Sequence, residues 1–374
     1  MALSKAQQTL VAKVKAVGNS GMAVSIDDDV CAYLLSVIVR DLGLEASFPE
    51  LSAIPLSFFR TIPAGTLRVE GLDFFALFER LLGLREDADT YFACLATLHK
   101  ARLKYERILQ AQPLPTIDQV GPRGLLQYGS LTPGALAAFL FWRKWIFDID
   151  NRSGQETGYL FEPIIASAIG GIPVSASRSP VKRRGNGTGR QVDCIRAVGK
   201  EAYEIKLRVT IAASGQGRWR EELDFPTDCQ ASGYRPVLVV LDPTPNSRLA
   251  ELKEAFTQAG GDAHIGPNAW RHLESLAGDT MAAFLKTYVH KPIDDLLKDS
   301  PDSLPDIKFS LRDDRFTVEV MGETLSLPRR IQAELASPDG EIPDDLDEAA
   351  LATERSFSSF VARSVTRRGP VTKW

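Results

Sequence analysis

Three charged residues, spaced as on two neighbouring strands, are the strongest candidates for catalytic residues in this sequence. Asp193 is followed eleven residues later by Glu204, and Lys206 comes two residues after that. If Val198-Gly199 form the turn of a hairpin, Asp193 and Glu204 lie opposite each other, with Cβ atoms about 5 Å apart. Two carboxylates at that distance repel each other, and a divalent cation between them would remove the repulsion. A shift of the hairpin register by one residue would separate them.

The residue types indicate which cation would bind. Mg²⁺ prefers oxygen ligands, usually keeps several water molecules and often binds a substrate phosphate. The candidate metal ligands are the side chains of Asp193 and Glu204 and the backbone carbonyl of Ile205, and Lys206 would project beside them. We therefore expect a Mg²⁺ site that orients or activates a water molecule, or offsets charge developing on a phosphoryl oxygen.

A strand over residues 202–211 would position these side chains. Alternate residues of a strand share a face, so Glu204, Lys206 and Arg208 would lie together. The opposite, apolar face would pack under a helix and consists of Tyr203, Ile205, Leu207, Val209 and Ile211. Further strands are predicted at 172–176, 191–197 and 236–241, and helices at 133–149, 157–169, 218–231 and 247–259. This order indicates an α/β core with helices on both faces of the sheet.

The chain divides into three predicted regions. Residues 1–112 would be mostly helical, because apolar residues recur every three or four positions within 74–82 and 91–110. The segment Gln112-Pro113-Leu114-Pro115 would end that region, and residues 113–290 would form the core. Residues 291–374 would form a small β-meander at 309–327 and then an acidic, partly flexible tail. The expected fold class is α/β (α+β): a mixed sheet flanked by helices, with a helical N-terminal region and a small β-rich C-terminal region.

Asp193 and the run Glu204-Ile205-Lys206 resemble the motif of PD-(D/E)xK nucleases, in which an acid ends one strand and Glu-x-Lys lies on the next. The resemblance covers roughly residues 155–245, although Val192 stands where a proline often precedes the acid. It implies a restriction-endonuclease-like core with Asp193, Glu204 and Lys206 as catalytic residues, joined by Glu162 from the preceding helix. More loosely, Gly158 to Pro163 and Ser214 to Trp219 look like the ApaLI-type restriction endonucleases.

Basic residues are concentrated around the predicted site. Between Ser177 and Arg220 the sequence has eleven Lys and Arg residues but three Asp and Glu residues, an excess of eight positive charges. Phosphate contacts by such residues would supply affinity for duplex DNA that does not depend on base sequence, and Gln and Arg can read base edges. The candidate DNA-binding residues are Arg178, Lys182, Arg183, Arg184, Arg190, Gln216, Arg218 and Arg220. A solvated basic loop without a ligand is the alternative interpretation.

Composition indicates the cellular compartment that we expect for the protein. The chain has 374 residues and a formal net charge of −4, so it is not uniformly basic. Its four cysteines lack CxxC spacing and its N-terminus lacks a signal-peptide pattern, which together indicate reduced thiols in a cytoplasmic protein. The apolar stretch 30–39 is shorter than the about 20 residues that a membrane span needs, so we expect a buried helix there and no membrane partner.

The leading hypothesis is a Mg²⁺-dependent type II restriction endonuclease that hydrolyses phosphodiester bonds of double-stranded DNA at a short specific site. The family resemblance implies a homodimer, whose twofold symmetry would match a palindromic site. The alternatives are a non-catalytic DNA-binding or interaction protein on the same scaffold, and a repair or junction nuclease of the same superfamily.

Overall fold

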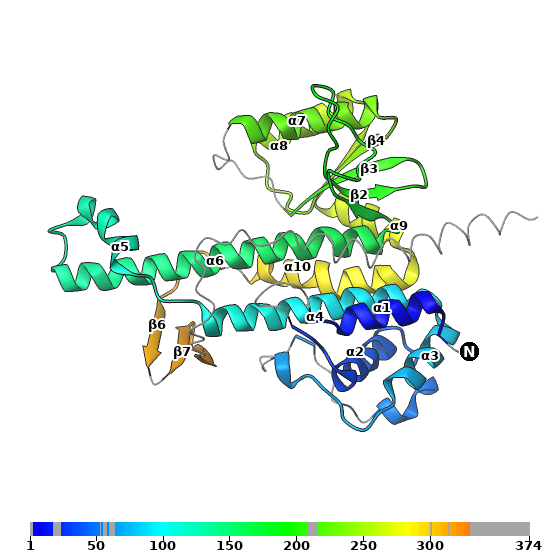
Figure 1. The fold of residues 1–374 in the computed structure, drawn as a ribbon, viewed down its shortest axis with the longest axis horizontal. Coiled ribbons are helices and arrows are strands. Elements are labelled where there is room, and N and C mark those ends of the chain that lie inside the picture. Colours follow the sequence, from blue (N-terminus) through cyan, green and yellow to red (C-terminus); the bar gives the residue numbers. More distant parts are fainter. Residues whose placement is uncertain are drawn as a thin grey trace, which may run out of the picture.

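The computed structural model describes residues 3–17, 24–52, 54, 58–59, 64–207, 216–299, 301–312 and 314–329 (Figure 1). These residues form helices, a mixed five-stranded sheet and a separate three-stranded antiparallel sheet. The expected fold class, a mixed sheet flanked by helices with a helical N-terminal region and a small β-rich C-terminal region, is confirmed.

The N-terminal region is helical, as its apolar periodicity predicts. Its helices are α1 (Lys5–Lys15), α2 (Asp28–Asp41), α3 (Phe74–Leu84) and α4 (Ala88–Ala111), with short 3₁₀ turns η1 (Glu45–Ser47), η2 (Pro49–Leu51) and η3 (Ala64–Thr66) between them. Asp27 and Asp73 cap α2 and α3 by accepting hydrogen bonds from the backbone N–H groups of Val30 and Ala76. Helix α4 ends directly before Gln112 and Pro113, and the predicted buried helix at 30–39 lies within α2.

The longest element is α6 (Pro133–Ala168), which follows α5 (Ile117–Val120) and η4 (Gly121–Gln127). The sequence predicted two helices here, at 133–149 and 157–169, and that prediction is wrong. A glycine inside a helix costs only about 0.5–1 kcal/mol relative to alanine, so Gly154 and Gly158 do not end it. Helix α4 runs alongside (Figure 1), and an ion pair between Lys104 Nζ and Glu156 Oε1 at 2.8 Å joins the two helices where a break was expected.

The central sheet has the order β1-β2-β3-β4-β5. Its strands are β1 (Ile172–Val174), β2 (Val192–Arg196), β3 (Glu201–Lys206), β4 (Arg235–Val240) and β5 (Asp262–Ile265). The first three strands pair antiparallel, whereas β3–β4 and β4–β5 pair parallel. Strand β5 was not predicted. The residues expected to continue the third strand, Arg208 to Ile211, lie outside the described residues.

Helices cover both faces of the central sheet. On one face, α6 and α9 (Pro267–Leu285) pack against Tyr203 and Ile205 of β3, within a hydrophobic cluster that extends into α2, α3 and α4. On the other face, α7 (Gln216–Ala231) and α8 (Ser247–Gln258) pack against Ala202 and Leu238. One continuous cluster therefore joins the N-terminal helices to the sheet, and the division of the chain at residue 112 stays a prediction.

The C-terminal part begins with a π-helical turn, η5 (Lys286–His290), and α10 (Lys291–Lys298). The predicted β-meander follows as β6 (Ile307–Arg312), β7 (Arg315–Val320) and β8 (Glu323–Pro328), and packs on Trp145 of α6. The acidic tail predicted beyond it lies outside the described residues. Within the part of the chain that the structure describes, no helix is long and apolar enough to cross a membrane.

Candidate active site

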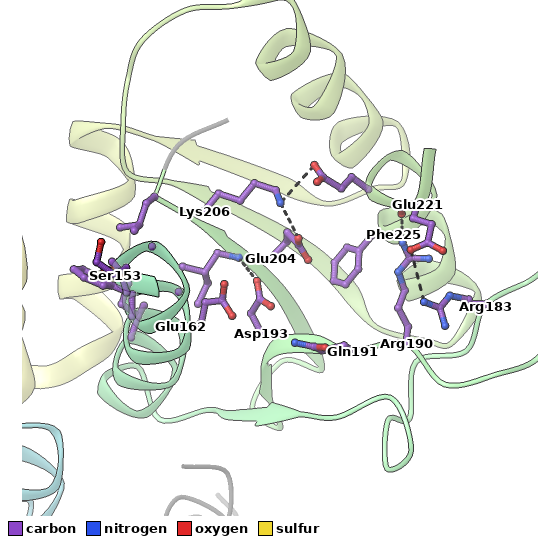
Figure 2. Close-up of a pocket in the computed structure, with 18 of the residues that line it drawn as sticks. Ser153, Glu162, Arg183, Arg190, Gln191, Asp193, Glu204, Lys206, Glu221 and Phe225 are labelled. Carbon is purple, nitrogen blue, oxygen red and sulfur yellow. Dashed lines mark hydrogen bonds and ion pairs between the residues drawn. The ribbon is translucent and has the colours of Figure 1, made fainter. Parts of the chain in front are cut away.

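A cavity of about 920 Å³ lies where α6 and α7 meet the ends of β2 and β3. One stripe of α6, with residues recurring every three or four positions from Asp150 to Ile165, forms one wall (Figure 2). Strand residues Asp193, Glu204 and Lys206 form the floor, and Glu221, Glu222 and Phe225 of α7 form the opposite wall.

The hairpin register brings the two predicted metal-binding carboxylates together. Cys194 pairs with Tyr203 and Arg196 with Glu201, and the same register extended by one pair aligns Asp193 with Glu204. The turn is centred between Val198 and Gly199, as expected, and Gly199 has a φ of 85° that glycine adopts readily. The carboxylate of Asp193 accepts a hydrogen bond of 2.8 Å from the backbone N–H of Ile205, which fixes its direction.

Lys206 lies between two carboxylates from different elements. Its Nζ is 3.0 Å from Glu204 Oε1 on the same strand and 3.5 Å from Glu222 Oε2 on α7. Burial alone would lower the pKa of Lys206, but the charges of Glu204, Glu222 and Asp193 outweigh burial and raise it. The ammonium group therefore stays protonated, pointing into the cavity (Figure 2).

Glu162 completes the acidic group from the α6 side of the cavity (Figure 2). Burial, with the nearby charge of Glu204, raises the pKa of Glu162 from 4.5 to about 7, while Lys206 opposes the shift. The pKa of Asp193 is raised too, first by burial and then by the charges of Glu204 and Glu162. The charge of Glu204 thus opposes the ionisation of both Glu162 and Asp193 within one cavity.

The donor set suits a hard cation that keeps water molecules. Among the residues that the structure describes, no three His, Cys, Asp or Glu side chains are arranged to hold a metal ion by themselves. Mg²⁺ does not require such a cage, because one or two carboxylates with water and substrate phosphates are enough. Asp193 and Glu204, with the carbonyl of Ile205, offer that number of oxygen ligands, and a cation would relieve the repulsion between the carboxylates.

The residues predicted to contact DNA lie on two elements, the loop before β2 and the start of α7. Arg183 and Arg190 line the end of the cavity away from Glu162 (Figure 2), and Arg178, Lys182 and Arg184 are exposed on the loop that carries them. Arg220 is exposed on α7. Gln216 and Arg218 belong to the first turn of α7, and their side chains lie outside what the structure describes.

Two of these arginines are held by a buried acid. Asp228 of α7, with a side chain only 4% exposed, accepts from Arg190 Nη1 at 2.6 Å and from Arg184 Nε at 3.2 Å. Arg190 also donates to the backbone carbonyl of Glu221 and stacks over the ring of Phe225. The guanidinium of Arg190 therefore joins the loop to α7.

Sequence reasoning missed two residues that organise the site, Glu222 and Asp228. Both lie on α7, far along the chain from the residues they contact. The signal that was present is the acidic run of α7, Glu221, Glu222, Asp224 and Asp228, which directly follows the basic window.

A mixed sheet with helices on both faces, whose hairpin carries carboxylates and a lysine into a cavity, has the architecture of a restriction-endonuclease core. The comparison with known families agrees: the model of the ApaLI-like restriction endonucleases matches residues 73–290. The chain belongs to this family.

Among curated proteins, the type II restriction enzyme ApaLI of Acetobacter pasteurianus is 56% identical over 215 residues. The match covers 56% of this chain and 57% of that enzyme, so it spans little more than half of each. No solved structure matches the chain.

Proposed function

We propose that this protein is a Mg²⁺-dependent type II restriction endonuclease that hydrolyses phosphodiester bonds of double-stranded DNA at a short specific site. The observation that carries the proposal is the gathering of Glu162, Asp193, Glu204 and Lys206 in one cavity. Membership of the ApaLI-like family supports it. In this proposal the core is of the PD-(D/E)xK type and the enzyme acts in the cytoplasm.

Asp193, Glu204 and the carbonyl of Ile205 would hold the metal, which when bound supplies positive charge next to the scissile phosphate. Lys206 would stabilise negative charge that develops on a phosphoryl oxygen, because its ammonium is largely buried and is held in position by Glu204 and Glu222. Glu162, with a pKa of about 7, is suited to accept a proton from the attacking water at neutral pH.

The basic loop and the start of α7 would position the duplex. Arg183 lines one end of the cavity, and Arg178, Lys182 and Arg184 are exposed on the same loop, so these four residues are the candidates for phosphate contacts. Gln216, Arg218 and Arg220 remain the candidates for contacts to base edges or phosphates. Arg190 would act mainly by holding the loop in place, since its guanidinium is paired with Asp228.

The experiment is digestion of plasmid DNA by the purified protein with Mg²⁺ or with EDTA. We expect discrete fragments with Mg²⁺ and intact plasmid with EDTA. Random degradation would instead indicate a repair or general nuclease. Absence of cleavage with retained DNA binding would indicate the non-catalytic alternative.

A further inference from the structure

A projecting arm, defined here as residues 113–148, carries a large share of the exposed apolar side chains. It consists of α5, η4 and the first part of α6. Its outer part extends away from the rest of the molecule (Figure 1), while Trp142 and Trp145 at its base pack against the sheet of β6 to β8. Of the twenty exposed large hydrophobic residues among those described, eight lie on this arm: Leu114, Ile117, Leu125, Leu126, Tyr128, Leu131, Phe139 and Phe147. Apolar side chains gathered in this way mark interaction sites on soluble proteins.

The arm has a packed core, so its exposed apolar residues lie on a folded surface. Val120, Leu136 and Leu140 form a small core of their own, separate from the main clusters. Turn η4 lies so close to α6 that a Cβ atom on Gly124 would come within 2.8 Å of Leu140. With its inner side held in this way, η4 presents Leu125 and Leu126 to solvent with 77% and 96% of their surface exposed.

The same arm also contains a hollow. A cavity of about 170 Å³ is bounded by Val120, Leu140 and Phe147 and by the side chains of Arg123, Arg143 and Lys144. At about 30 Å³ for each water molecule, this is the space of five or six waters, which is enough for one leucine side chain. The arm thus carries an exposed leucine pair and an apolar recess, which is the self-complementary pairing that a twofold interface requires.

The size of the apolar surface fits a stable dimer. The exposed fractions of the eight residues add up to about five whole residues, each worth roughly 150–250 Å² if aromatic and somewhat less if aliphatic. The total is on the order of the ~800 Å² that each partner buries in a standard interface.

Charge argues against DNA as the occupant of this surface. The arm has three basic residues, Arg123, Arg143 and Lys144, against Asp118 and Asp148, and Lys144 is already ion-paired with Asp148 at 2.5 Å. A duplex would require many unpaired Lys and Arg side chains to neutralise its phosphates.

We propose that two copies of this chain associate through residues 113–148, with Leu126 of each copy packing into the hollow beside Phe147 of the other and Leu125 packing against its rim. The inference rests on the homodimer expected for the proposed function, and it assigns the projecting arm as the interface of that dimer. It does not depend on catalysis.

The test is the mass of the full chain in solution, measured by light scattering without DNA or Mg²⁺. The wild type should have twice the 41.0 kDa of one chain. The variants Leu125→Asp/Leu126→Asp and Phe147→Asp should dissociate at least about 30-fold more readily, because each would bury an unpaired charge at a hot spot. Leu304→Asp is the matched control: Leu304 is 98% exposed but lies outside the arm, so that variant should stay dimeric.

The possible outcomes test the dimer and its proposed interface separately, and none of them requires a measurement of cleavage. A wild type of 41.0 kDa would overturn the dimer and its interface together. A dimeric wild type whose arm variants are also dimeric would overturn the interface alone. Arm variants that keep the dimer mass but lose duplex affinity would assign the leucines to DNA instead. None of these results depends on whether the protein cuts DNA.

Discussion

At the residue scale, Glu162 is the group whose protonation is most open to measurement. Burial, with the charge of Glu204, raises its pKa from 4.5 to about 7. In the unfolded chain Glu162 ionises near its ordinary value, so between about pH 4.5 and 7 the folded protein binds more protons than the unfolded one. Stability contributed by this group is therefore present below pH 4.5 and is lost as the pH rises through 7.

Glu162→Gln should remove this pH dependence. In EDTA, we expect the variant to be more stable than the wild type by up to about 3 kcal/mol at pH 8, since each pKa unit corresponds to about 1.4 kcal/mol. The difference should shrink as the pH falls through 4.5, because well below that pH Glu162 is neutral in the folded and in the unfolded state. Urea unfolding of both proteins across this pH range measures it.

Glu254→Gln provides the control, because Glu254 is exposed on α8 away from the cavity. Its effect should not change with pH. If Glu162→Gln also gives a constant difference at every pH, Glu162 does not carry the raised pKa.

At the element scale, α7 connects the basic loop to the hairpin of β2 and β3. Its residue Asp228 holds Arg184 and Arg190, and six residues earlier Glu222 contacts Lys206. Residues six apart are separated by about 9 Å along a helix, so a single rigid element sets the distance between the two ends of the cavity.

Asp228→Ala should destabilise the fold by about 3–5 kcal/mol, because it leaves the buried Arg190 charge without its partner. Replacing Arg190 by Met in the same chain should recover part of this loss, since the unpaired charge is then removed as well. Denaturant unfolding of the two single variants and the double variant measures the coupling.

Asp224→Ala is the matched control on the same helix. The Asp224 side chain is 50% exposed and 3.8 Å from Arg184, so its loss should cost less than about 1 kcal/mol. Equal effects of the Asp224 and Asp228 substitutions would contradict the structural role of the buried pair.

The elements differ in how far the sequence could predict them. The hairpin of β2 and β3 follows from local alternation and a two-residue turn, and its register matches the prediction. Strand β5 could not be read in this way, because all four of its residues are only half-buried and form no apolar run. Helix α6 was divided in error because the contacts with α4 across its middle, which include the ion pair between Lys104 and Glu156, are not visible in sequence.

At the scale of the whole molecule, charge is distributed differently from what the sequence window indicates. The excess of eight positive charges between Ser177 and Arg220 falls to four once the acidic residues of α7, which fold against the same loop, are included. Glu222 and Asp228 contact Lys206 and Arg190 only because α7 packs over the sheet. The sequence thus predicted residues that the fold gathers in one cavity, whereas the partners that hold them could be identified only from the fold.

The most direct measurement compares cleavage and binding by the Asp193→Ala variant. In Mg²⁺, single-turnover cleavage of plasmid DNA should fall by at least about 10³-fold relative to the wild type, because the variant lacks one of the two carboxylates that would hold the metal. Its affinity for the same DNA should change by only a few-fold, and Lys253→Ala on the exposed side of α8 should cut normally. Cleavage by Asp193→Ala at the wild-type rate would contradict the assignment of this cavity as the active site.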